Sequence, residues 1–280
     1  VPSIGEKPRL ASVRGGDREW RGRPVEWGGC LMTCDTRFVH GDGDALDAMI
    51  LAGGKGTRLR SVVDDRPKPM AQVAGRPFVE WLLAMLYDQG TRRVVLCTGH
   101  LADHVEAYFG DGRRWNMELC YSRDPFPLGT GGAVRRGLDH VRGDRFLVLN
   151  GDSYCRFDRG ALLRTHMRTG AAATLWLVGA DDCRRYGSVR IGPEGAVESF
   201  AEKSSDFGTG LVNAGIYLIE RRAAETIPTG RAVSLENDVF PALIGRGLFA
   251  VVGESPFTDI GTPESYADAE EFIAAEGRRW

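Results

Sequence analysis

The chain lacks the features that would place it outside the cell or in a membrane. Its 280 residues include only six cysteines, too few for a disulfide framework in a chain of this length. No apolar run reaches the roughly 18 residues that a membrane span requires, and no basic stretch leads into a signal-peptide core. We therefore expect a cytoplasmic protein with reduced cysteines and no membrane partner.

An excess of charge of one sign is also missing. The 36 Lys and Arg residues nearly balance the 38 Asp and Glu residues, so the formal net charge is −2. A general attraction to nucleic acid or acidic lipid is therefore not expected. Cys30 and Cys34 are spaced like zinc ligands, but no second Cys or His pair follows at a matching distance. Nucleic-acid binding and a structural zinc are both disfavoured.

The apolar pattern divides the chain at about residue 45. Residues 1–44 hold eight glycines and three prolines without a sustained apolar period, so we expect a poorly structured tail. Residues 45–280 alternate apolar runs with amphipathic stretches, which predicts one α/β domain built on a Rossmann-like, doubly wound, mixed but mostly parallel sheet. The predicted strands are 48–52, 93–98, 118–121, 145–150, 172–178, 214–219 and 249–252, with a β-hairpin over 187–201. The predicted helices are 78–87, 102–108, 133–141, 159–169, 221–227, 237–246 and 263–275.

A glycine-rich turn follows the first predicted strand and reads Leu-Ala-Gly-Gly-Lys-Gly-Thr-Arg-Leu from Leu51. Backbone amides in such a turn can point at an anion. A Walker A loop would need Ser or Thr after Lys55, where Gly56 stands, and a dinucleotide fingerprint would need a small residue in place of Leu59. Further on, prolines on both sides fix the backbone around Lys68. The pattern indicates a phosphate site of another kind.

These two segments, AGGKGTRL and RPKPM, resemble the signature of the sugar-1-phosphate nucleotidyltransferases, and the match extends over most of residues 47–272. Within that family the chain is most similar to the D-glycero-D-manno-heptose 1-phosphate guanylyltransferases. The resemblance implies Arg58, Lys68 and Asp152 as catalytic residues. It implies a nucleotide site at Leu51, Ala52, Gly53, Gly54, Lys55, Gly56, Thr57, Arg58, Gly99, Gly129, Thr130 and Gly131, the last three lying in the PLGTGG segment.

Three further segments carry the resemblance into the rest of the site. Asp152 ends a strongly apolar strand, Asp259 lies in an Asp-Ile-Gly-Thr-Pro segment, and the resemblance implies that both bind Mg²⁺. It implies a sugar-phosphate site, partly on the hairpin, at Tyr186, Gly187, Glu202, Lys203 and Asn213. Glu236 and Asp238 also follow a family pattern, although capping of a helix explains them equally well.

The expected reaction joins a sugar 1-phosphate to a nucleoside triphosphate and releases pyrophosphate. GTP is the first choice of nucleotide and ATP the second, and heptose, mannose and glucose 1-phosphates all remain open as the other substrate. Departures from the family pattern at residues 61–65 and 153–155 leave the substrate undecided. A catalytically silent nucleotide-sugar-binding protein is the alternative from another class, and a homo-oligomer remains open.

Overall fold

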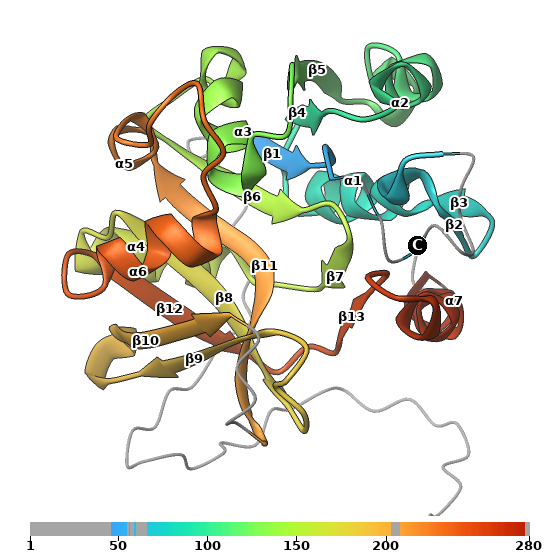
Figure 1. Ribbon diagram of the computed structural model, residues 1–280. Coiled ribbons are helices and arrows are strands. Elements are labelled where there is room, and N and C mark those ends of the chain that lie inside the picture. Colours follow the sequence, from blue (N-terminus) through green and yellow to red (C-terminus); the bar gives the residue numbers. More distant parts are fainter. Residues whose placement is uncertain (1–45, 55, 57–58, 60–65, 203–207, 278–280) are drawn as a thin grey trace, which may run out of the picture. The chain divides into compact units, whose positions relative to one another are not determined.

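A nine-stranded mixed sheet runs through the described part of the chain (Figure 1). The computed structural model describes residues 46–54, 56, 59, 66–202 and 208–277, all within a unit delimited as Val39–Trp280. Four strands are mutually parallel, in the order β6, β1, β4, β5. Their carboxyl ends therefore meet at one edge of the sheet, where ligands of such folds bind. The four are β1 (Ala48–Leu51), β4 (Arg93–Thr98), β5 (Glu118–Arg123) and β6 (Arg145–Asn150).

The long strand β11 (Gly210–Glu220) connects this parallel part to the second half of the sheet. It is antiparallel to β6 and β8 and also meets the hairpin through β9. Its ladder with β8 is interrupted between Asn213 and Tyr217, where Gly215 has a φ of +74°. The remaining strands are β8 (Ala173–Ala180), β9 (Gly187–Ile191), β10 (Val197–Glu202) and β12 (Leu248–Gly253). The expected mixed sheet and its hairpin are thus confirmed.

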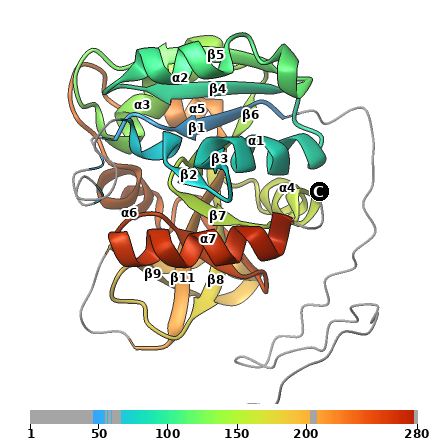
Figure 2. The same ribbon diagram turned by 90° about the vertical axis from the view of Figure 1, so that its right-hand side faces the viewer.

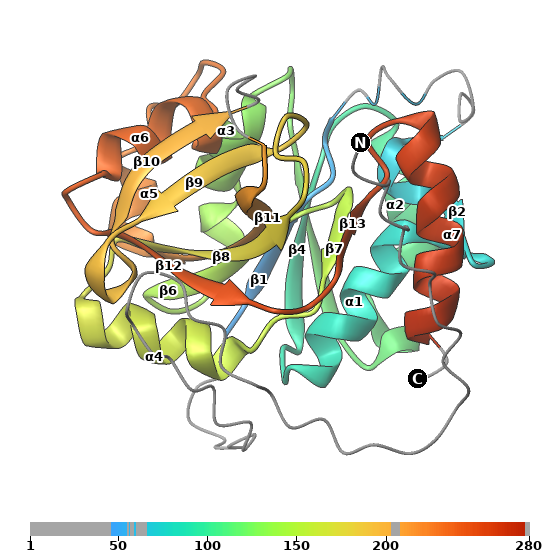
Figure 3. The ribbon, with the colours of Figure 1, turned by 90° about the horizontal axis from the view of Figure 1, so that it is seen from below.

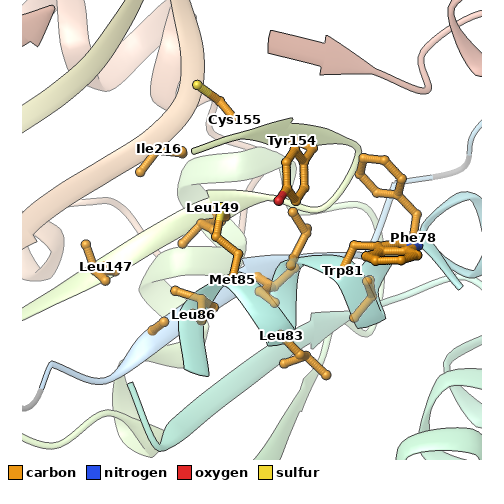
Figure 4. Close-up of a cluster of buried hydrophobic side chains, with 14 of the residues drawn as sticks. Phe78, Trp81, Leu83, Met85, Leu86, Leu147, Leu149, Tyr154, Cys155 and Ile216 are labelled. Carbon is orange, nitrogen blue, oxygen red and sulfur yellow. The ribbon is translucent and has the colours of Figure 1, made fainter. Parts of the chain in front are cut away.

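Side chains alternate between two cores on the opposite faces of the sheet. In β1, Ala48 and Ile50 belong to one core and Met49 to the other. Figure 4 shows Met85 of the first helix beside Leu149 of β6, and Leu86 and Leu147 belong to the same cluster. The first core takes α1 (Phe78–Asp88), α2 (Ala102–Phe109), α4 (Arg159–Thr169) and α7 (Pro263–Gly277). The second takes α3 (Gly129–Gly137), α5 (Arg221–Glu225) and α6 (Phe240–Leu243), so the sheet is covered on both faces (Figure 3).

Two small antiparallel sheets accompany the main one. The hairpin of β2 (Gln72–Val73) and β3 (Arg76–Pro77) leads into α1. The strands β7 (Ser153–Cys155) and β13 (Phe257–Asp259) pair although about a hundred residues separate them. Figure 2 shows α7, which follows β13, lying along the same side as α1. Neither pair is expected from the sequence pattern, and the second shapes the candidate site.

Two helices differ from the prediction by more than one or two residues at an end. The helix expected at 133–141 begins at Gly129 and continues as a 3-10 turn, Leu138–His140. The helix expected at 237–246 is a π-helical turn, Leu235–Val239, followed by α6, because Ser234 caps an earlier start. Other 3-10 turns are Lys68–Met70, Arg113–Trp115 and Pro193–Gly195. Among the described helices, none has the length and apolar character needed to cross a bilayer.

Candidate active site

The loops after β1, β4 and β6 touch one another backbone to backbone. A Cβ on Gly99 would lie 2.8 Å from the carbonyl oxygen of Gly53, and a Cβ on Gly151 would lie 2.5 Å from that of Leu51. Only glycine allows these approaches. None of the described residues accepts a hydrogen bond from the amides of Gly53 or Gly54. These two donors at the carboxyl edge of the sheet are available to an anionic ligand.

Lys68, which lies between two prolines, packs against this glycine-rich turn. Pro67 precedes the short 3-10 turn that carries Lys68, and a Cβ on Gly56, whose φ is +58°, would lie 2.9 Å from the Lys68 Cβ. The ammonium group of Lys68 donates to Oδ2 of Asp152 at 2.5 Å. The side chain of Lys68 is 14% exposed and that of Asp152 is 41% exposed. The aspartate is therefore the member of the pair that solvent or a ligand can reach. The structure therefore brings these two predicted catalytic residues together.

The pairing of β7 with β13 places the two predicted metal-binding aspartates next to each other. Ser153 is opposite Asp259 in the register, and the amide of Ile260 donates to the Asp152 carbonyl at 2.9 Å. Asp259 accepts hydrogen bonds from the Tyr186 hydroxyl at 2.7 Å, the Gly261 amide at 2.6 Å and the Ser265 hydroxyl at 2.9 Å. These donors fix the orientation of the Asp259 carboxylate.

The charge of Lys68 favours the ionised form of Asp152. Burial alone would raise the pKa of Asp152, but the charge and hydrogen bond of Lys68 outweigh it and lower that pKa. Burial, followed by the hydrogen bond to Asp259, raises the pKa of Tyr186, so this tyrosine stays a donor at neutral pH. Arg185, 45% exposed, lies 3.6 Å from Oδ2 of Asp259. Sequence reasoning missed this cation, and its position before the predicted Tyr186 is the only sequence feature that points to it.

The two aspartates are suited to hold a hard divalent cation. Within the described residues no group of three or more His, Cys, Asp or Glu side chains is arranged to bind a metal. Mg²⁺, however, needs only one or two protein carboxylates, with water and phosphate completing its shell. Asp152 accepts two hydrogen bonds and Asp259 three, and a carboxylate has about four acceptor positions. Each therefore keeps acceptor capacity for a cation.

Asp124, which the sequence analysis also missed, lies beside the glycine turn. Its amide donates to the carbonyl of Thr98 at the end of β4, and its Oδ2 would be 3.4 Å from a Cβ on Gly53. Its Oδ1 is buried, and none of the described residues donates a hydrogen bond to it. Burial raises the pKa of Asp124 to about 6, against the opposing charge of Arg136. This oxygen is therefore available to a donor from beyond the described residues.

The glycines of the PLGTGG segment pack closely against another part of the chain. The amide of Gly131 donates to the Val233 carbonyl at 2.9 Å, and a Cβ on Gly129 would lie 2.5 Å from the same oxygen. The hydroxyl of Thr130 donates to Glu236 at 2.7 Å. The Gly131 amide is therefore occupied within the chain. A nucleotide contact of Gly129, Thr130 and Gly131 remains a prediction, and their visible role is to seat residues 233–236.

The predicted sugar residues converge on the hairpin and β11. Gly187 begins β9 and pairs with Glu202 at the end of β10, while Val212, next to Asn213, pairs with Ser188. Asn213 is only 9% exposed, and its side chain is bonded at both ends. The backbone therefore places Gly187, Glu202 and Asn213 on neighbouring strands. The predicted residues Lys55, Thr57, Arg58 and Lys203, and the side chain of Glu202, lie outside the described part of the chain.

The same region matches known proteins in sequence and in structure. Mannose-1-phosphate guanylyltransferase of Mycobacterium tuberculosis is 40% identical over 224 residues, which are 79% of this chain and 62% of that protein. D-glycero-alpha-D-manno-heptose 1-phosphate guanylyltransferase of Aneurinibacillus thermoaerophilus is 32% identical over 81% of this chain and 97% of its own length. The crystal structure of HddC from Yersinia pseudotuberculosis, complexed with GMP-PN, has a TM-score of 0.72 and 35% identity over 81% of this chain and 99% of HddC.

This chain thus spans nearly the whole of the heptose enzyme and of HddC, but less than two thirds of the mycobacterial enzyme. The family description "Nucleotidyl transferase" matches residues 47–276, which include both aspartates, Lys68 and the glycine turn. The chain belongs to the nucleotidyl transferase family.

Proposed function

We propose that this protein transfers a guanylyl group from GTP to D-glycero-D-manno-heptose 1-phosphate, or a close hexose relative, and releases pyrophosphate. The observation that carries the proposal is the meeting of Lys68, Asp152 and Asp259 beside the open amides of the glycine turn. A cation, two carboxylates and free backbone donors are what a reaction between two polyanions requires. None of these groups needs to form a covalent bond to substrate.

The chemistry is a substitution at the α-phosphorus of the triphosphate. An oxygen of the sugar 1-phosphate forms the new P–O bond, and the bond to the β-phosphate breaks with its electron pair leaving on pyrophosphate. Lys68 offsets the negative charge that develops there, and the amides of Gly53 and Gly54 hold the triphosphate. Asp152 and Asp259 would hold Mg²⁺, which neutralises phosphate charge when bound. Loss of one such charge contact costs about a hundredfold in rate.

Asp124 supports guanine as the base. Guanine presents two adjacent donors, N1–H and the N2 amino group, to a single acceptor such as a carboxylate. Adenine and uracil present only one donor with acceptors beside it. The carboxylate of Asp124, with Oδ2 beside Gly53 and with Oδ1 receiving no hydrogen bond from the described residues, is suited to that donor pair. The guanine nucleotide in the HddC complex and the names of both relatives agree with this choice.

The choice of heptose rests on the resemblance of the AGGKGTRL and RPKPM segments to the heptose 1-phosphate guanylyltransferases and on the match to the enzyme of A. thermoaerophilus. The mannose enzyme of M. tuberculosis is 40% identical over the matched region, so mannose 1-phosphate stays a candidate. Heptose 1-phosphate is therefore the first substrate to try and mannose 1-phosphate the second.

The proposal is tested by pyrophosphate release with four nucleoside triphosphates crossed against heptose, mannose and glucose 1-phosphates. We expect the highest kcat/KM with GTP and heptose 1-phosphate, a requirement for Mg²⁺, and loss of turnover in Asp152→Asn with an unchanged circular dichroism spectrum. Higher kcat/KM with ATP would overturn the choice of base. Full turnover by Asp152→Asn would overturn the assignment of the metal, and no turnover with any pair would favour the silent binding protein.

A further inference from the structure

Glu236 connects the two substrate sides of the site through hydrogen bonds. Its Oε2 accepts from the hydroxyls of Thr130 at 2.7 Å and Ser234 at 2.9 Å. The amide of Leu235 donates back to the Thr130 hydroxyl at 2.8 Å. The start of α3, which holds the predicted nucleotide residues Gly129, Thr130 and Gly131, is thereby tied to the π-helical turn.

The other carboxylate oxygen of Glu236 reaches toward β11. Oε1 accepts from the Tyr217 hydroxyl at 3.4 Å, and that hydroxyl accepts from Nδ2 of Asn213 at 2.7 Å. The amide of Gly215 donates to Oδ1 of Asn213 at 3.0 Å, so both ends of this side-chain amide are fixed. The interruption of the β11 ladder between Asn213 and Tyr217 lets both side chains meet at one place.

We propose that Glu236 is a positioning residue that sets the nucleotide side through Thr130 and the sugar side through Tyr217 and Asn213. This inference rests on the proposed function, because the two sides are defined by the two substrates. Its chemical basis is that three hydroxyl donors share the one carboxylate of Glu236 as their acceptor. Removing the Glu236 carboxylate would take away the acceptor that these hydroxyls share. The nucleotide side and the sugar side would then no longer be held by the same residue.

Helix capping is the competing explanation, and the structure assigns that role to other residues. Ser234 accepts from the Asn237 amide at 3.1 Å, and Asp238 accepts from the Ser234 amide at 2.7 Å. Glu236 makes neither of these two bonds, since its own contacts are to hydroxyl groups. Asp238 therefore provides a matched control, because it is an acidic residue of the same turn whose side chain, among the described residues, bonds to the helix start.

The test measures KM for each substrate, kcat and Tm in five variants, using the nucleotide and sugar 1-phosphate that the wild-type chain turns over best. Tyr217→Phe should raise KM for the sugar phosphate about fivefold and leave the nucleotide KM unchanged. Thr130→Val should do the reverse. Glu236→Ala should raise both about tenfold, Glu236→Gln should recover most of the loss, and Asp238→Ala should lower Tm without moving either KM.

Equal effects of Tyr217→Phe on both substrates would overturn the proposal. So would a Glu236→Ala variant that matches Asp238→Ala, with a lower Tm and both KM values unchanged. Calorimetric Kd values for GTP and mannose 1-phosphate are measured in the same variants, so the two sides are read even if no pyrophosphate is released. A wild-type chain that prefers ATP or another sugar phosphate contradicts the substrate assignment alone.

Discussion

Asp124→Asn is the substitution that separates the proposed base specificity from simple burial of a carboxylate. The folded-state pKa of Asp124 is raised from 3.8 to about 6, chiefly by burial. A carboxyl with a raised folded-state pKa binds its proton more tightly when folded, so stability falls as the pH rises from about 4 to 6. At pH 7 the ionised side chain costs about 3 kcal/mol, which its partial exposure reduces to about 1–2 kcal/mol.

Asparagine has a similar shape and no charge, so the variant should be more stable than the wild type without ligand. We expect Tm to rise by about 2–4 °C for each kcal/mol recovered. The same change removes a charged acceptor for the two guanine donors. Matched base contacts of this kind are worth about 1–3 kcal/mol, so the ratio of kcat/KM for GTP over ATP should fall by about 5- to 150-fold.

The assays are thermal unfolding without nucleotide at pH 5 and pH 7, and initial rates of pyrophosphate release with GTP and with ATP. The gain in Tm should be smaller at pH 5, where Asp124 is largely protonated in the folded protein. Asp139→Asn is the matched control, because Asp139 is an exposed aspartate on the 3-10 turn that follows α3. It should change neither Tm nor the preference for GTP over ATP. A higher Tm with an unchanged GTP preference would refute the base contact, and an unchanged Tm would refute the cost of burial.

Three other predictions concern separate parts of the fold. Lys203→Ala should raise KM for the sugar phosphate more than for the triphosphate, and equal increases would contradict its placement on the sugar side. Gly151→Ala should lower both Tm and kcat, because the added Cβ would lie 2.5 Å from the Leu51 carbonyl oxygen and would force the loops after β1 and β6 apart. A variant with the wild-type Tm would contradict that contact. Burial lowers the pKa of His166 despite its bond to a carboxylate, so wild-type stability should fall as the pH drops below about 6.5, and His166→Gln should flatten Tm over that range.

Periodicity was sufficient for the main elements because their burial is regular. Strands such as β4 and β6 are continuous apolar runs, and α1 buries residues on most of its surface, so each is recognisable from local sequence. The start of α3 was placed too late because Gly129, Gly131 and Gly132 have low helix propensity. Tertiary contacts with Val233 outweigh that propensity, and no local pattern reports them.

The parts of the site that sequence reasoning missed depend on contacts between distant segments. β7 and β13 have three residues each, too short for an alternating pattern, and their pairing alone explains how Asp152 meets Asp259. Asp124 is recognised by its place beside Gly53 and by a buried oxygen that none of the described residues donates to, and a sequence shows neither. The sequence places Glu236 in a motif but does not distinguish a capping role from a positioning role. The hydrogen bonds that Thr130 and Tyr217 donate to Glu236 favour positioning.

The difference between Asp124 and the other site carboxylates has a physical meaning. Asp152 is paired with Lys68, Asp259 is held by three donors, and Glu236 accepts from three hydroxyls. Groups already satisfied within the chain keep their geometry before substrate arrives and cost little to reorganise. An unsatisfied carboxylate destabilises the free protein, and a ligand with matching donors recovers that cost on binding. Preorganisation should therefore reside in the first three residues and selectivity between bases in Asp124, so substitutions of the first group should lower turnover with every nucleotide.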